Sequence, residues 1–171
     1  MTTKVPDPDN WTSRFDKGKT IYTCKPLACA DAVSVTVTPG QSPTRNPNPQ
    51  ALEKLAKVDL PKRMKAITAA ASVMSEQDSK LETLTSKVTS MLGYPSIEDE
   101  MKLTRGKTAM FLDAAVIFAG PLMVTVTATS PDRAVAVKSL NDFIGGMKID
   151  DGPGLPSKPA LAPSTPPPTK I

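Results

Sequence analysis

Histidine is absent from this chain of 171 residues, and aromatic side chains are few, with four Phe, two Tyr and one Trp. Without histidine, the chain lacks the commonest general base at neutral pH and the commonest transition-metal ligand. So few aromatic residues disfavour a surface that stacks nucleic-acid bases. Because the sequence has no run of about 18 apolar residues, we expect no transmembrane helix. The composition thus disfavours an enzyme, a nucleic-acid binder and a membrane-spanning protein.

Complete catalytic motifs are lacking as well. Gly-Lys-Thr occurs at 18–20 and at 106–108, but a phosphate-binding loop needs a glycine five residues earlier, where Ser13 and Met101 stand. Asp7 and Asp9 resemble the start of a calcium-binding loop whose later glycine and glutamate are missing. We therefore expect no enzyme and no cofactor, and we interpret both Gly-Lys-Thr segments as hairpin turns.

Neither sign of charge is strongly in excess, since 21 basic and 17 acidic residues give a net charge of +4. The densest basic run, formed by Lys62, Arg63 and Lys65, is interpreted as the solvated face of a helix. This mild excess favours solubility and a weak attraction to anionic surfaces, which would permit peripheral membrane association. It does not require a nucleic-acid partner.

Cysteine occurs twice, at Cys24 and Cys29. Two cysteines are too few for structural zinc, and their spacing differs from that of a C-x-x-C redox pair. A disulfide between them would close a short loop between two predicted strands, provided that the compartment is oxidising. In a reducing compartment the same pair would be two half-buried thiols, and the sequence leaves both alternatives open.

Alternating apolar and polar residues predict an antiparallel sheet. A first hairpin joins 20–24 to 33–38, and Pro39-Gly40 is expected to end it. The segment 81–92 fits both a strand and a helix, and its many threonines and serines favour the strand. Further strands are predicted at 97–103, 109–119 and 122–129. The run at 109–119 is apolar on both faces, which is typical of a central strand.

Three helices are predicted between and after these strands. The first begins at Asn48-Pro49, with Asn48 as N-cap, and the second carries an apolar stripe of Leu60, Met64, Ile67, Ala71 and Met74. The third follows Ser130-Pro131-Asp132, with Ser130 as the expected N-cap, and ends at Gly145-Gly146.

These elements predict one α+β domain over residues 19–149, in which helices flank a meandering antiparallel sheet. Residues 1–18 are expected to form an N-terminal extension. Residues 150–171 contain seven prolines and few large apolar side chains, which predicts a disordered tail. The spacing of Pro163 and Pro166 fits a PxxP peptide, but a passive extended spacer is the favoured interpretation.

Acidic residues provide the candidate ligand site. Asp113 lies inside the apolar run 109–119, where a carboxylate must find a partner, change its pKa or face a water-filled concavity. A hydrogen-bonded or ion-paired Asp113 is the favoured interpretation, and a ligand site is the alternative. Glu98 and Glu100 share one face of a predicted strand, where Lys102 beside them favours a solvated ladder of charges.

The C-terminal half also resembles the PsbP/DcrB-like superfamily. The similarity covers about residues 80 to 147 and rests on Leu92-Gly93-Tyr94-Pro95, on Ala119-Gly120-Pro121 and on the Ser130-Pro131-Asp132-Arg133-Ala134 segment. The resemblance implies an α/β/α sandwich, in small and often exported or membrane-anchored proteins that act by binding partners. It carries over no functional residue, because fold similarity does not transfer a site.

Taken together, the sequence favours a non-enzymatic accessory or interaction protein of a bacterium, exported to the periplasm, with another protein as its partner. Since MTTKVPDPDNW lacks the apolar core of a signal peptide, export would mean that the leader is absent from this chain. One alternative is a cytoplasmic partner-binding or chaperone-like protein. Another is a small-ligand or metal-ion binder that uses Asp113 or the Glu98/Glu100 face.

Overall fold

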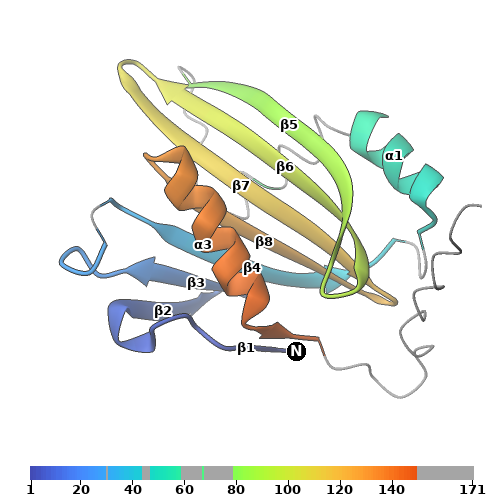
Figure 1. Cartoon of the computed structure of the whole chain (residues 1–171), viewed down its shortest axis with the longest axis horizontal. Helices are drawn as coiled ribbons and strands as arrows, with labels where there is room; N and C mark the ends of the chain where they lie inside the picture. Colours follow the sequence, from blue (N-terminus) through green and yellow to red (C-terminus); the bar gives the residue numbers. More distant parts are fainter. Residues whose placement is uncertain (30, 44–46, 59–66, 68–78, 150–171) are drawn as a thin grey trace, which may run out of the picture.

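The computed structural model describes residues 1–29, 31–43, 47–58, 67 and 79–149. Its main element is a seven-stranded antiparallel sheet with the strand order β2-β3-β4-β8-β7-β6-β5, and a separate pair joins β1 to β9. Strands β5 to β8 form one meander and β2 to β4 another, and the two meet where β4 pairs with β8. Figure 1 shows α3 lying across one face of this sheet.

The elements have the following bounds along the chain. They are β1 (Thr2–Thr3), η1 (Pro8–Asn10), β2 (Trp11–Asp16), β3 (Lys19–Cys24), β4 (Ser34–Gln41), α1 (Pro49–Val58), β5 (Ser79–Met91), β6 (Tyr94–Arg105), β7 (Thr108–Ala119), β8 (Leu122–Ser130), α3 (Arg133–Gly145) and β9 (Met147–Lys148).

Each face of the sheet carries its own helix. Leu140 and Phe143 of α3 pack against one face in a cluster that includes Ile117 of β7. Leu52 of α1 packs against the other face in a cluster that includes Val116, the neighbour of Ile117. Because successive side chains of a strand point to opposite faces, α1 and α3 lie on opposite sides of the sheet. The predicted α/β/α sandwich on an antiparallel sheet is therefore confirmed.

Several local predictions are confirmed. The ambiguous segment 81–92 lies almost entirely within strand β5. Strand β7 is flanked by β6 and β8 and is buried from Leu112 to Ala119, as expected of a central strand. Both Gly-Lys-Thr segments are hairpin turns, in which Gly18 has a φ of 83° and Gly106 a φ of 57°. Positive φ is the reason that glycine occupies these two turns.

Residues 1–18 are not an extension outside the domain, which corrects that prediction. Strand β2 pairs with β3 from Trp11↔Cys24 to Asp16↔Lys19, and Thr2–Thr3 pairs with β9. The Trp11 ring packs edge-on against Phe143 of α3, with ring centroids 4.9 Å apart. The N-terminal strands thus complete both the sheet edge and the core under α3.

Strand β4 does not end at Pro39-Gly40 but continues to Gln41, which corrects a second boundary. Pro39 lies opposite Val124 of β8, whereas the pairing of β4 with β3 ends at Val37. Beyond Val37 the strand therefore has a neighbour on one side only, and a proline fits there because no second ladder is interrupted.

Helices α1 and α3 begin with side-chain caps. The backbone N–H of Ala51 donates to Asn48 Oδ1 over 2.7 Å, which confirms Asn48 as the N-cap of α1. Helix α3 is capped by Asp132, which accepts from Val135 N–H over 3.1 Å, and not by Ser130 as predicted. Ser130 still belongs to strand β8, so the helix starts two residues later than predicted.

Two predictions fall outside the described residues. They are the second helix with its basic run, of which Ile67 alone is described, and the disordered tail at 150–171. Ile67 is buried against Met101, Leu112 and Ala114, on the same sheet face as α1. Both predictions therefore stay predictions.

Candidate functional site

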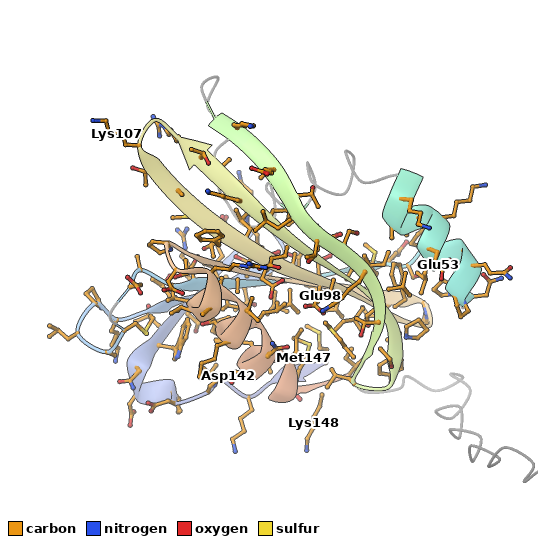
Figure 2. All side chains as sticks on the ribbon, turned by 45° about the horizontal axis from the view of Figure 1, so that its top comes forward. Glu53, Glu98, Lys107, Asp142, Met147 and Lys148 are labelled. Atoms are coloured by element: carbon orange, nitrogen blue, oxygen red, sulfur yellow. A yellow bond between two sulfur atoms is a disulfide. The ribbon has the colours of Figure 1, made fainter. Side chains whose placement is uncertain are left out.

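A cleft of about 800 Å³ opens between the first turns of α3 and strands β5 to β7. We call it the acidic cleft, and its wall includes Lys87, Glu98, Glu100, Phe111, Arg133 and Val137. Figure 2 shows Glu98 on the sheet, on the β5 side of α3. The cleft thus lies on the α3 face, at the end of the apolar core of that face.

Strand register places a third carboxylate, that of Asp113, behind the two glutamates of the cleft wall. Asp113 of β7 lies directly opposite Glu100 of β6, and Glu98 lies opposite Ala115. Because residues two apart on a strand point to the same face, the side chains of Glu98, Glu100 and Asp113 share the face that α3 covers. Directly paired Cβ atoms are about 5 Å apart, so the three charges act on one another.

Glu100 is paired with the first residue of α3. The Arg133 guanidinium donates to both carboxylate oxygens, from Nε to Oε1 and from Nη2 to Oε2, the latter over 2.9 Å. This bidentate bond lowers the pKa of Glu100 against the opposing effect of its burial. The Glu100 side chain is 11% exposed and that of Arg133 is 56% exposed, so the pair lies at the water boundary.

Glu98 forms the second ion pair of the cleft. Its Oε2 atom lies 3.1 Å from Lys87 Nζ, and the lysine side chain is 58% exposed. Glu98 therefore keeps one exposed counter-charge, as Glu100 does. Exposed pairs of this kind contribute little to stability, because solvent and salt screen them.

Asp113 is the unpaired member of the group. The residue is 1% exposed, and no described side chain donates a hydrogen bond to either carboxylate oxygen. Burial, followed by the negative charges of Glu98 and Glu100, raises the pKa of Asp113 to about 7, against the lowering effects of Lys87 and the nearby Ala114 backbone. A buried carboxylate in this state is unusual in a fold core and is typical of ligand sites.

A second, smaller cavity lies between the cysteine loop and the middle of α3. Its volume is about 360 Å³, and its wall includes Trp11, Cys29, Val135 and Phe143. The Cys24 and Cys29 sulfur atoms lie at disulfide-bonding distance, with Cα atoms 6.2 Å apart. The cysteine pair therefore closes the loop that forms one wall of this cavity.

The comparisons with known proteins concern the fold. No family model matches the chain, and no curated protein matches its sequence. Among solved structures, cyanobacterial PsbP (CyanoP) from Synechocystis sp. PCC 6803 superposes with a TM-score of 0.51 at 14% identity, over 85% of this chain and 89% of that chain. The chain has the PsbP-like fold. A Pseudomonas aeruginosa protein of unknown function, PA94, superposes with a TM-score of 0.50 at 12% identity, over 89% and 99% of the two chains.

The resemblance predicted for the C-terminal half is thus confirmed at the level of the fold and extends over most of the chain. At these identities the two neighbours support the architecture and carry no site residue across. No helix in the described part of the chain is long and apolar enough to cross a membrane.

The solvated ladder predicted for Glu98, Glu100 and Lys102 is wrong for Glu100, which is 8% exposed and bonded to Arg133. The prediction failed because it treated the strand face as open to water, whereas the start of α3 covers it. Asp113 is buried as expected, but it lacks the hydrogen-bond or ion-pair partner that was the favoured interpretation.

Sequence reasoning missed Arg133 and Lys87 as members of the site. Arg133 stands 33 positions from Glu100, and only the placement of α3 brings the two together. The available signal was the acid-rich strand face itself, which requires cations from other elements. Among the described residues, no group of three or more acidic or cysteine side chains is arranged so that it could hold a metal ion.

Replacing both Cys24 and Cys29 by serine is expected to lower the free energy of unfolding by about 2 kcal/mol, since the lost cross-link restricts the unfolded chain. Urea denaturation of the oxidised wild type and the double variant measures the difference. The wild type treated with a dithiol reductant is the matched control and should lose the same amount. Equal stability of all three samples would contradict a disulfide in the folded protein.

Proposed function

We propose that this chain is a non-enzymatic accessory protein of an oxidising, extracytoplasmic compartment, which acts by binding another protein in the acidic cleft. The observation that carries the proposal is Asp113, a buried carboxylate without a described side-chain partner, which lies directly opposite Glu100 of the cleft wall. Leaving such a group unpaired costs free energy of folding, and a bound ligand that pairs with it recovers that cost.

The wall of the cleft suits a protein segment. Phe111 and Val137 offer apolar surface, while Lys87, Glu98 and Arg133 offer charges of both signs. Protein interfaces combine such an apolar centre with a polar rim. A wide, open cleft of about 800 Å³ also leaves one side of any occupant in contact with solvent, which suits the side chains of a partner.

The cysteine pair supports the oxidising compartment. Disulfides persist in exported proteins and are rare in the cytosol, and the Cys24 and Cys29 sulfurs lie at bonding distance. Their oxidation is tested by measuring the intact mass, with and without a thiol-alkylating reagent, of protein recovered from its source cells. We expect no alkylation. Two alkylated thiols would favour the cytoplasmic partner-binding alternative.

Partner binding is tested by filling the cleft. Ala134 is an exposed residue of α3 in the cleft wall, so Ala134→Trp occupies the cleft without removing any of its charges. Ala51, exposed on α1 against the opposite face, provides the matched control Ala51→Trp. A tagged chain expressed in its source cells is cross-linked in place, and its co-purifying proteins are quantified.

We expect the wild type and Ala51→Trp to recover the same partner, and Ala134→Trp to lose it at least tenfold. Equal recovery by all three chains would contradict binding in the acidic cleft. The same experiment addresses the small-ligand alternative, since a cleft that served a small molecule would show no protein whose recovery depends on Ala134.

A further inference from the structure

We infer that the acidic cleft binds a guanidinium group and that the chain's own Arg133 occupies the site until an arginine of the partner replaces it. The inference rests on the proposed function, because it names the chemical group by which the partner is recognised. It stands on three observations, which are the bidentate Arg133–Glu100 bond, the buried Asp113 beside it and the exposure of Arg133.

The bond to Glu100 shows that the site accepts the planar fork of a guanidinium. Two nitrogens of Arg133 donate to the two oxygens of one carboxylate, which is the geometry that distinguishes arginine from lysine at carboxylate sites. Arg133 therefore acts as an internal model of the ligand, and the cleft already provides its principal acceptor.

Charge around the site favours a cation that lies closer to Asp113 than Arg133 does. Glu98, Glu100 and Asp113 supply three carboxylates, while Lys87 and Arg133 supply two cations, each bonded to one glutamate. With Asp113 ionised, the five groups carry a net charge of −1, located on the least solvated member. A guanidinium that replaces Arg133 and contacts both Glu100 and Asp113 would place a positive charge beside Asp113, which has no ion-pair partner among the described residues while Arg133 is bonded to Glu100.

Arg133 does not form an ion pair with Asp113 while it is bonded to Glu100. Its side chain starts from the first turn of α3 and already donates to both oxygens of Glu100, and Asp113 retains no described partner. A guanidinium carried by another chain is not anchored at this helix end, so it can approach from the open side of the cleft. Because Arg133 is 56% exposed, it can move into water when it is displaced.

Proton exchange accompanies such binding. The charged groups around Asp113 are Glu98 and Glu100 from β6, Lys87 from β5 and Arg133 from α3, whereas its β8 neighbour, Ala128, is apolar. A cation beside Asp113 favours its ionised form, so binding should release a proton below neutral pH and tighten as the pH rises.

The first test is chemical rescue. Arg133→Gln removes the internal guanidinium and leaves Glu100 buried without its partner, so we expect a lower thermal midpoint. Low-millimolar guanidinium chloride, far below denaturing concentrations, should raise that midpoint by several degrees and leave the wild type unchanged. Equal concentrations of sodium chloride and of urea separate this effect from ionic strength and from denaturant action.

Arg14→Gln is the matched control, since Arg14 is exposed on β2, a strand that does not line the cleft. It should show neither destabilisation nor rescue. If Arg133→Gln does not fold, Arg133→Lys keeps the charge but lacks the fork, and the same rescue is expected of it. A folded variant at Arg133 that guanidinium does not stabilise would overturn the inference.

The second test uses N-acetyl-arginine amide as the probe and N-acetyl-citrulline amide as its uncharged counterpart. Titration followed by amide chemical shifts should show the arginine probe binding to Arg133→Gln at least tenfold more tightly than to the wild type. The citrulline probe should not bind, and Asp113→Asn added to Arg133→Gln should weaken the arginine probe. Equal binding of the two probes would overturn the inference.

The two levels of the proposal fail separately. Loss of the partner from Ala134→Trp without any guanidinium rescue would leave the cleft as a protein-binding site of another chemistry. Guanidinium rescue together with partner recovery that is independent of Ala134 would leave the guanidinium site and remove its proposed use.

Discussion

Replacing Asp113 by asparagine is expected to change the free energy of unfolding by different amounts at different pH. The difference between the variant and the wild type should favour the variant by about 2 to 3 kcal/mol more at pH 8 than at pH 5. Burial and the neighbouring glutamates raise the pKa of the wild-type carboxylate to about 7 in the folded protein, from an ordinary value of 3.8. Asparagine has a similar shape and does not titrate, so it removes the dependence on pH that comes from this group.

The sign follows from proton binding. Between pH 3.8 and about pH 7 the folded state holds the Asp113 proton and the unfolded state does not. A rise in pH through this window therefore favours the unfolded state. The stability that protonated Asp113 contributes is fully present only below pH 3.8. Above about pH 7 Asp113 is ionised in both the folded and the unfolded state, so its contribution to stability no longer changes with pH.

Urea denaturation at pH 5 and pH 8 measures the effect for the wild type, Asp113→Asn and a control, Glu53→Gln. Figure 2 shows Glu53 on α1, the helix that covers the opposite face of the sheet, and the residue is exposed. The control should follow the wild type at both pH values. A stability difference between Asp113→Asn and the wild type that is equal at both pH values would show that Asp113 does not titrate near neutrality.

Replacing Gly146 by alanine is expected to lower the free energy of unfolding by about 3 kcal/mol. A Cβ atom at this position would lie 2.2 Å from the backbone oxygen of Lys4, and a backbone atom cannot yield as a flexible side chain does. The Lys4 N–H donates to the Gly146 oxygen over 2.8 Å, so the clash also breaks the bond that leads into the β1–β9 pair.

Gly145→Ala is the matched control for this substitution. Gly145 is the last residue of α3, and a Cβ atom there would meet nothing within 4 Å. It should leave stability unchanged or raise it slightly, because alanine favours a helix more than glycine does. Urea denaturation compares the two variants, and limited proteolysis reports release of the N-terminal strand. Equal stability of both variants would show that β1 does not hold its place against β9.

Most of the sheet could be predicted because strand signals are local. The apolar run at 109–119 and the alternation at 97–103 depend only on neighbouring residues, and both are strands of the structure. Strand β2 was missed because most of its residues are exposed at the edge of the sheet. Its place depends on the ladder with β3, which leaves little trace in its own pattern.

Helix α3 shows where local rules compete. Ser130 and Asp132 are both suitable caps, and Pro131 favours a helix that starts directly after Ser130. The structure uses Asp132, because Ser130 is still paired with β7 as the last residue of β8. The choice depends on the length of a neighbouring strand, which propensity does not reveal. The same two-residue shift makes Arg133 the first residue of α3.

The candidate site was predictable in part. Asp113 stood out because a carboxylate interrupted an apolar run, and Glu98 and Glu100 because they alternated with apolar residues. Their counter-charges could not be predicted, since Lys87 and Arg133 come from elements whose packing is decided by the whole fold. The sequence indicated the acidic floor of the cleft, and the structure adds the cations at its rim.

The pairing of β1 with β9 also bears on the order in which the chain folds. Thr2 and Lys148 are nearly as far apart in sequence as the described residues allow, yet they lie side by side in this ladder. A contact of such long range forms late, because closing so large a loop becomes favourable only once the intervening strands and α3 have assembled. The β1–β9 pair thus forms last during folding. Fluctuations that open the native state should therefore begin with the separation of these two strands.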